Sequence, residues 1–176
     1  MHKVNDLFGK EVINQTTGDR IALVRDVVLA ADLREIAALV LGPGGLFSDK
    51  LVVRWSTIIS LGDVIVVAGT TPLPPIKQDA EVAELRNLAV RITGVAVITA
   101  TGDRLGTVSD IGFDARGRVL GYEISHGVLG GFIGQRFLPS EQIQSVGKDA
   151  IIVTTTELSS VKEFERSLGE EHDAAV

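Results

Sequence analysis

The sequence predicts a mainly β protein built from two tandem copies of one small barrel, with a short linker helix between the copies and a short C-terminal helix. The tetrapeptide TGDR occurs at residues 17–20 and again at residues 101–104, in similar surroundings. Short segments rich in Val, Ile and Leu, typical of β-strands, are separated by clusters of Gly, Asp and Pro. The chain has 19 glycines against six Phe, one Tyr and one Trp, which indicates many turns and an aliphatic core.

The repeat extends well beyond the tetrapeptide. At an offset of about 84 residues the strand and turn positions of the two halves coincide, and small slips fall where loops are expected. We therefore expect two domains, each of about 70 residues and only marginally stable alone, that pack together. The predicted organisation is domain 1 over residues 1–71, a proline-rich linker with a short helix over 72–87, domain 2 over 88–156, and a helix and tail over 157–176.

Strands are expected in the first copy over residues 20–29, 35–41, 51–54 and 63–67. Residues 20–29 are apolar at odd and even positions alike, whereas a strand with one face in water would alternate. This favours a strand that bends sharply around a small closed barrel, with a bulge near Asp26 and, in the second copy, near Asp110.

The turns between strands depend on glycine. Gly18 and Gly102 can adopt positive φ in the two TGDR turns, where Asp19 and Asp103 can hydrogen-bond the backbone that follows. Gly117 suits the strained position of a second turn. The first copy has no glycine at the matching place, so its turn must differ in detail.

Both helices have capping signals. Prolines at 72, 74 and 75 end the last strand of the first copy, and Asp79 can cap the helix that follows. Ser160 and Glu163 have the spacing of a capping box at the start of the C-terminal helix. Gly169 is the expected end of that helix, followed by a frayed tail.

The second copy, GVAVITATGDRLGTVSDIGFDARGRVLGYEIS with RFLPSEQIQSVGKDAIIV, resembles the PRC-barrel domain. It carries the Gly-Asp turn, a Gly-x-Val-x-Asp strand and a Leu-Pro-x-x-x-Ile segment. The first copy carries most of this pattern but has Ala22 in place of glycine and Trp55 in place of proline. The resemblance implies a bent antiparallel β-barrel that acts through protein contacts, as in the photosynthetic reaction-centre H subunit and the C-terminal domain of RimM. It implies no catalytic residue.

Composition narrows the function classes. The net charge of −6 makes direct nucleic-acid binding unfavourable, because an acidic surface repels phosphate. The chain has no cysteine, which excludes disulfides, thiolate metal sites and Cys nucleophiles. No apolar run is long enough to span a membrane, and the first residues lack the apolar core of a signal peptide, so we expect a cytoplasmic protein.

The sequence gives only weak signals for a catalytic or metal-binding site. His126 follows Ser125 and lies near Glu123, but adjacent residues of one strand point to opposite faces, which favours a histidine at a strand end over a Ser–His–acid site. Asp103, Asp110 and Asp114 lack the spacing of a calcium-binding EF-hand loop. We therefore expect no enzyme, with no catalytic residue, metal or cofactor.

Two glycine-rich loops at corresponding places carry large apolar residues. If exposed, they form a partner-binding tip, and if folded inward they plug a barrel end. Trp55 is a candidate for the seam between the barrels. The predicted function is a non-enzymatic protein-interaction or assembly module that binds another protein or a second copy of itself. The alternative is a small-molecule or metal-binding sensor with a site between the barrels. The candidate partner-binding residues are Leu46, Phe47, Trp55, Leu129, Phe132 and Ile133.

Overall fold

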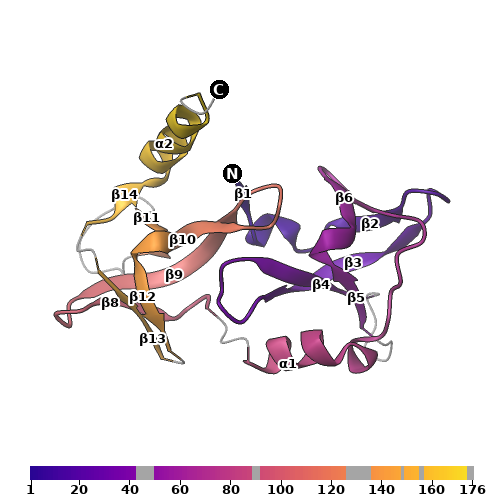
Figure 1. The fold of residues 1–176 in the computed structure, drawn as a ribbon, viewed down its shortest axis with the longest axis horizontal. Helices are drawn as coiled ribbons and strands as arrows, with labels where there is room; N and C mark the ends of the chain where they lie inside the picture. Colours follow the sequence, from indigo (N-terminus) through magenta and orange to yellow (C-terminus); the bar gives the residue numbers. More distant parts are fainter. Residues whose placement is uncertain (43–49, 89–91, 126–135, 148, 155–156, 174–176) are drawn as a thin grey trace. The chain divides into compact units, whose positions relative to one another are not determined.

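The computed structural model describes residues 1–42, 50–88, 92–125, 136–147, 149–154 and 157–173 (Figure 1). Contacts divide the chain into two compact units. The N-terminal unit comprises His2–Ala89 and Phe113–Val119, and the C-terminal unit comprises Met1, Val90–Gly112 and Leu120–Val176. Each unit has its own sheet, and the two helices are α1 (Ala80–Leu88) and α2 (Val161–Asp173). The mainly β fold with two sheets, a linker helix and a C-terminal helix is confirmed.

The N-terminal sheet has six strands in the order β5-β4-β3-β2-β7-β6. In chain order they are β2 (Glu11–Asn14), β3 (Arg20–Leu29), β4 (Ile36–Gly42), β5 (Leu51–Arg54), β6 (Ile58–Leu61) and β7 (Ile65–Val67). The short β1 (His2–Lys3) and the 3-10 helix η1 (Asn5–Leu7) precede them. The expected strands 20–29 and 51–54 have the predicted bounds, whereas the strand expected from residue 63 begins at Ile65.

Strand direction corrects one expectation from the family resemblance. β2 and β7 pair in parallel, and the remaining pairs of this sheet are antiparallel. A hairpin would reverse the chain, but the 3-10 helix η2 (Trp55–Thr57) joins β5 to β6 without a reversal. The parallel pair follows from this connection. Among the described strands the pairing runs as an open path from β5 to β6 and not as a closed, wholly antiparallel ring.

A β-bulge bends β3 where the sequence places it. The register between β3 and β4 shifts between Val24 and Asp26, which confirms the expected bulge. The Val27 N–H donates to Asp26 Oδ1 at 3.0 Å. In the second copy the Ile111 N–H donates to Asp110 Oδ1 at 2.8 Å, so the two aspartates make equivalent local hydrogen bonds.

The linker helix is an integral part of the N-terminal unit. Asp79 caps α1 as predicted, since its Oδ1 accepts the Val82 N–H at 3.1 Å. The Arg86 Nε also pairs with Asp26 Oδ2 at 3.0 Å, which ties α1 to the bulge in β3. Fully burying one valine is worth about 1.5–3 kcal/mol, so the docking of α1 contributes directly to stability. The apolar cluster under α1 consists of Val28, Ala38, Val40, Val52 and Val82, with Ile76 and Leu85 packed against it.

The C-terminal sheet repeats this topology. The strands on its main path are β8 (Ala96–Thr99), β9 (Arg104–Phe113), β10 (Val119–Ser125), β11 (Arg136–Pro139), β12 (Ile143–Val146), β13 (Ala150–Val153) and β14 (Ser159–Ser160). Their order is β12-β13-β8-β9-β10-β11-β14, and β8 pairs with β13 in parallel, as β2 does with β7. The 3-10 helix η4 (Ser140–Gln142) stands where η2 stands in the first copy.

The TGDR turns have the predicted glycine conformation. Gly18 has φ +72° and Gly102 has φ +94°. The hydrogen bonds that brace these turns come from earlier side chains, because Asn14 Oδ1 accepts the Thr16 N–H at 2.8 Å and Thr99 Oγ1 accepts the Asp103 N–H at 2.9 Å.

The second pair of turns differs in detail, as expected. Gly117 has φ +85°, and the matching Leu33 has φ +61° without being glycine. The turn of the first copy is closed by the Ala30 N–H donating to the Glu35 carbonyl. The turn of the second copy takes one residue fewer, because the Asp114 N–H donates to the carbonyl of residue 118.

The C-terminal helix begins with the predicted capping box. The Ser160 N–H donates to Glu163 Oε2 at 2.8 Å, and the Glu163 N–H donates to Ser160 Oγ at 3.2 Å. Phe164 stacks on the buried Phe137, with ring centroids 4.2 Å apart. The helix continues past Gly169 to Asp173, so the expected end was wrong. A glycine inside a helix costs only about 1 kcal/mol, and no proline follows to break the helix here.

In both units, the chain that leaves the sheet covers one of its edges. The Val52 N–H donates to the Pro74 carbonyl at 3.0 Å, and the Ile76 N–H donates to the Lys50 carbonyl at 2.8 Å, along the outer side of β5. In the C-terminal unit β14 pairs with the outer side of β11. The linker and the segment before α2 therefore have the same structural role.

Candidate functional site

Trp55 lies at the start of η2 in the N-terminal unit and is 8% exposed. Its ring meets Phe113 edge to face, with centroids 5.4 Å apart and an interplanar angle of 89°. The His2 ring also lies 5.5 Å from the Phe113 ring. Edge-to-face pairs of this kind contribute about 0.5–1.5 kcal/mol beyond the area they bury. Trp55 is therefore a fixed part of an aromatic cluster.

The hairpin tip, residues 113–119, completes this cluster. It follows β9 in the second repeat of the sequence but belongs to the N-terminal unit. Two backbone hydrogen bonds hold it there, from the Ile36 N–H to the Gly117 carbonyl and from the Val119 N–H to the Arg34 carbonyl, both 2.8 Å. A Cβ atom on Gly117 would lie 2.6 Å from Cδ1 and 2.7 Å from Cε2 of Trp55. Gly117 is thus required for its backbone conformation and for close contact with the indole.

Asp114 stiffens the hairpin tip. Its Oδ1 accepts the backbone N–H groups of Arg116 and Arg118, each at 2.9 Å, and its Oδ2 pairs with Arg118 Nε at 2.7 Å. Partial burial acts to raise the pKa of Asp114, but the hydrogen bonds and charge of Arg118 and the Arg116 N–H outweigh it, so the pKa lies below its ordinary value. The carboxylate is therefore charged at neutral pH and holds the turn closed.

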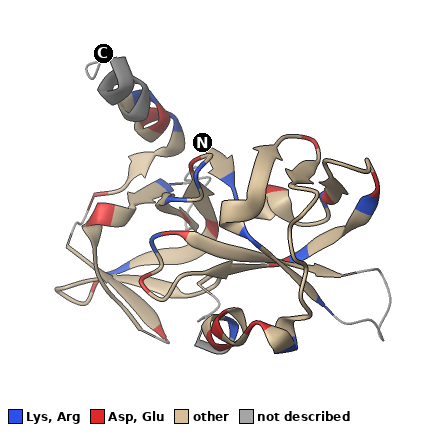
Figure 2. Ribbon diagram, turned by 45° about the vertical axis from the view of Figure 1, so that its right-hand side comes forward, with Lys and Arg blue, Asp and Glu red and all other residues tan. Residues whose placement is uncertain are grey.

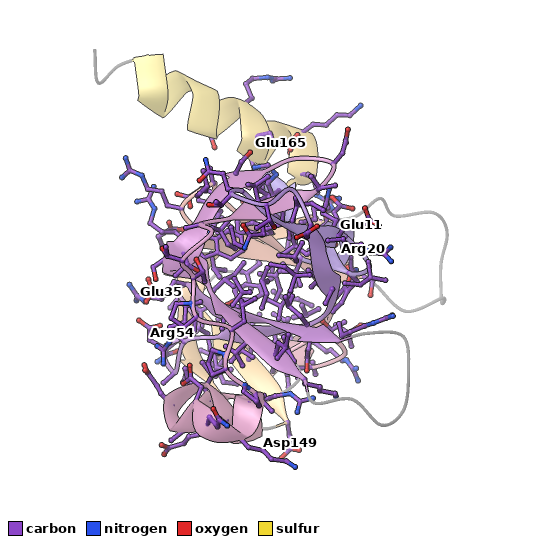
Figure 3. The ribbon with its side chains drawn as sticks, turned by 90° about the vertical axis from the view of Figure 1, so that its right-hand side faces the viewer. Glu11, Arg20, Glu35, Arg54, Asp149 and Glu165 are labelled. Atoms are coloured by element: carbon purple, nitrogen blue, oxygen red, sulfur yellow. The ribbon has the colours of Figure 1, made fainter. Side chains whose placement is uncertain are left out.

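Basic residues (blue) and acidic residues (red) are interspersed along the ribbon (Figure 2). Glu11 and Arg20 lie side by side and pair at 2.8 Å (Figure 3). Arg54 binds Asp79 and Glu81, each at 2.8 Å. The pKa of Arg54 is raised chiefly by its hydrogen bond to Glu81, against partial burial. Exposed pairs of this kind contribute little, about 0–1 kcal/mol each, so their main effect is on local geometry.

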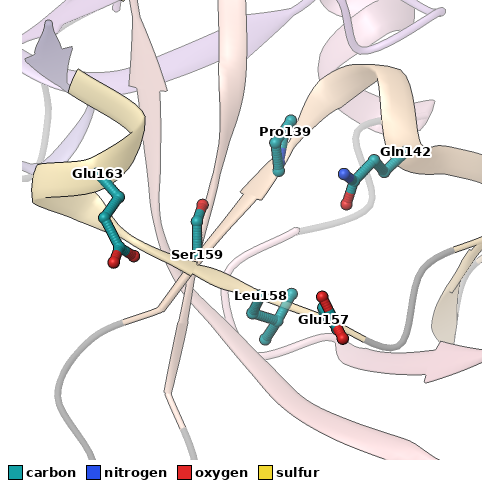
Figure 4. A pocket seen from close by; sticks show the side chains of 6 residues that line it. All are labelled: Pro139, Gln142, Glu157, Leu158, Ser159 and Glu163. Atoms are coloured by element: carbon teal, nitrogen blue, oxygen red, sulfur yellow. The ribbon is translucent and has the colours of Figure 1, made fainter. Parts of the chain in front are cut away.

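Two features of the surface have no counterpart in the sequence-based expectations. In the N-terminal unit, Phe8 is 46% exposed and Ile59 is 51% exposed. In the C-terminal unit, a pocket of about 380 Å³ lies beside η4, β14 and the first turn of α2 (Figure 4). The strand pattern of residues 58–61 hints at an outward Ile59, but the pocket draws side chains from separate elements and has no sequence signature.

Comparison with known protein families shows which family this chain belongs to. The PRC-barrel domain matches residues 1–72 and again residues 86–159. The chain belongs to the PRC-barrel family. The two matched ranges are consistent with two tandem PRC-barrel units, which confirms the resemblance. Comparison with the curated proteins gave no match.

Only part of the predicted partner-binding site lies within the described residues of this PRC-barrel protein. Of the six candidate partner-binding residues, Trp55 alone is described, and it packs against Phe113 and Gly117. Its role at a seam stays a prediction. His126 and the five candidates of the glycine-rich loops lie outside the described residues, namely Leu46, Phe47, Leu129, Phe132 and Ile133.

Metal binding and membrane insertion are considered for the described residues. Within the described residues, no three His, Asp or Glu side chains come close enough together to hold a metal ion. Over the same residues, no helix has the length and apolar character needed to cross a membrane.

Proposed function

We propose that this protein is a non-enzymatic protein-interaction or assembly module built of two PRC-barrel domains. The observation that carries the proposal is the family match over both halves of the chain. PRC-barrel domains act through protein contacts in the reaction-centre H subunit and in RimM. A tandem pair offers two such surfaces in one chain, and the proposed domain limits are residues 1–71 and 88–156.

Exposed apolar side chains support a role in binding. Phe8 and Ile59 leave about half of their surface in water, and burying a side chain of this size is worth about 1.5–3 kcal/mol. Ile59 lies on β6, which ends the order of the N-terminal sheet. We propose that a partner protein, or a second copy of this chain, covers this region and the glycine-rich loops.

The proposed setting is the cytoplasm. With a net charge of −6, the surface favours a protein partner over direct contact with nucleic acid. The interaction is therefore expected to depend on apolar contacts and to persist in moderate salt.

Affinity purification of the full chain from its native cells tests the proposal. Wild type should recover the same defined partner in repeated experiments, and F47S, F132S and I59S should each be compared with the surface control K162S. Loss of recovery in a loop or β6 variant, with K162S unchanged, supports the proposal. Equal recovery by every variant counts against these surfaces. A thermal-shift screen with metals and nucleotides tests the sensor alternative, because a ligand that binds only the folded protein raises the melting temperature.

A further inference from the structure

The segments that cover β5 and β11 are held unequally. The N-terminal cover, residues 74–86, includes α1, where Val82 is fully buried and Arg86 pairs with the bulge of β3 at 3.0 Å. The C-terminal cover, residues 158–164, lies on β11, and none of the described side chains from residue 157 to 167 is buried. The N-terminal cover is therefore part of a core, whereas the C-terminal cover lies on the surface of its unit.

The pocket of the C-terminal unit lies along this surface cover. Its volume is about 380 Å³, and Leu158, Ser159 and Glu163 line it from the cover while Pro139 and Gln142 line it from β11 and η4 (Figure 4). Side chains that face such a space have no packing partner on that side and lose dispersion contacts. Release of the C-terminal cover is therefore less costly than release of the N-terminal cover.

Where the C-terminal cover touches β11, the fit is specific. The strand pairing places Ser160 opposite Arg136. The Arg136 Nη1 donates to the Leu158 carbonyl at 2.9 Å. The Phe164 ring stacks on the buried Phe137 ring, with centroids 4.2 Å apart and an interplanar angle of 26°. The β11 edge thus recognises both the backbone and the aromatic ring of this segment.

Charge complementarity adds to this fit. The pKa of Glu163 lies below its ordinary value, chiefly because its carboxylate accepts the Ser160 N–H, with a further contribution from the positive charge of Arg136. A carboxylate of the cover is therefore attracted to a guanidinium of β11. The capping bonds between Ser160 and Glu163 lie within the segment, so it keeps its helix start when it leaves its own unit.

We propose that β11 accepts the C-terminal cover of a second copy of this chain in place of its own, which joins two copies by exchange of residues 158–164. A second copy is the occupant that fits, because it carries the Leu158 carbonyl, the Glu163 carboxylate and the Phe164 ring that β11 already binds. The incoming segment makes the same contacts as the resident one, so exchange sacrifices no interaction.

Chain connectivity sets the concentration at which exchange occurs. The resident segment competes as a tethered ligand, with an effective concentration on the order of millimolar, so exchange increases as the protein is concentrated. This inference goes beyond the proposed function, because it uses neither the glycine-rich loops nor the exposed apolar side chains of the N-terminal unit. Either can therefore fail while the other holds.

Single-cysteine variants test the exchange, because the chain has no cysteine of its own. R136C in one chain and S160C in another cannot form a disulfide within either chain. Opposite positions of antiparallel strands lie about 4.5–5.5 Å apart at Cα, within the range of a disulfide. In glutathione buffer their mixture should give about tenfold or more mixed dimer than R136C with K162C, whose thiol is exposed on the same segment.

The N-terminal cover supplies a matched control. Leu51 and Pro75 lie opposite each other across the covered edge of β5, so L51C is mixed with P75C in the same way. This mixture should give no more dimer than random collision does. If R136C with S160C also gives only that background, the exchange does not occur. Equal yields at both edges would show that the disulfides trap unfolded chains, which also overturns the proposal.

F164A separates exchange from a general loss of stability. In the S160C chain it weakens the incoming segment and should lower the yield of mixed dimer by about threefold or more. In the R136C chain it weakens the resident segment, leaves β11 open more often and should raise the yield. E165A, at an exposed position of the same helix, should have neither effect (Figure 3). A change in the same direction in both chains refutes the exchange.

Sedimentation of the unmodified chain completes the test. Wild type should shift from monomer toward dimer between about 10 μM and about 1 mM. The dimer should persist in I59S and F47S, which alter only the surfaces of the proposed function. A wild type that stays monomeric at the highest concentration overturns the proposal. A dimer that is lost in I59S or F47S belongs to those apolar surfaces and overturns it as well.

Discussion

The contact between Gly117 and Trp55 gives the most quantitative test of the fold. In G117A the new methyl group would lie 2.6 Å from Trp55 Cδ1, where carbon atoms normally stay about 3.5–4.0 Å apart. The indole cannot retreat freely, because it is 8% exposed and packs edge-on against Phe113. The hairpin tip and Trp55 must therefore move apart, or the backbone hydrogen bonds of the tip must weaken.

The expected loss has two parts. Alanine at φ +85° costs about 1–2 kcal/mol relative to glycine. Forcing a methyl group into a packed contact costs about 1–3 kcal/mol more. The free energy of unfolding of the N-terminal unit should fall by about 2–5 kcal/mol.

Urea unfolding followed by fluorescence measures this loss, because Trp55 is the only tryptophan and reports on its own unit. The control is G18A in the same unit, where φ is +72° but nothing lies within 4 Å of the added methyl group. G18A should lose about 1–2 kcal/mol from the backbone alone. In a W55L background, followed by circular dichroism, the extra loss caused by G117A should largely disappear.

Two outcomes would refute the reasoning. If G117A and G18A destabilise the protein equally, the contact with the indole has no energetic effect. If G117A causes the same loss with Trp55 and with leucine at position 55, the clash lies elsewhere.

Three further predictions concern other positions. L33N should raise the free energy of unfolding by about 0.5–1 kcal/mol in urea titrations, because asparagine tolerates the left-handed φ of +61° better than leucine. D114N should destabilise the N-terminal unit at pH 7 and progressively less at acid pH, since a carboxylate with a lowered pKa stabilises above its unfolded pKa and loses that effect as the pH falls through the folded value; urea midpoints measured at pH 7 and at a series of acid pH values check this. E163A should speed amide hydrogen exchange in the first turn of α2, and E163Q should not.

Local patterns were sufficient for much of the architecture. Runs of Val, Ile and Leu between turn residues located β3 and β5, and capping residues located the starts of α1 and α2. These features depend on interactions within a few residues of the chain. The strand expected from residue 63 starts later because Gly62 and Val64 form a tight turn, with the Gly62 N–H donating to the Val64 carbonyl at 3.1 Å.

Features set by distant residues were not predictable in the same way. The parallel pairing of β2 with β7 depends on how η2 redirects the chain, which no periodicity encodes. Gly117 was explained by its turn, but its contact with Trp55 joins residues far apart in the sequence. The pocket of the C-terminal unit forms only when the segment around β14 lies beside η4 and the first turn of α2, which no local pattern encodes.

The chain that covers β5 and β11 limits where this protein can be divided. A fragment that stopped at residue 71 would leave the outer edge of β5 with unpaired N–H and C=O groups. Such an edge can pair with a strand of another molecule and lead to aggregation. Pro74 and Pro75 suit this position at the border of the sheet, because proline has no N–H that could pair with a further strand. The repeating unit of this protein therefore includes the segment that covers the sheet edge. A duplication that omitted this segment would have left an open edge strand and favoured polymerisation over a tandem protein.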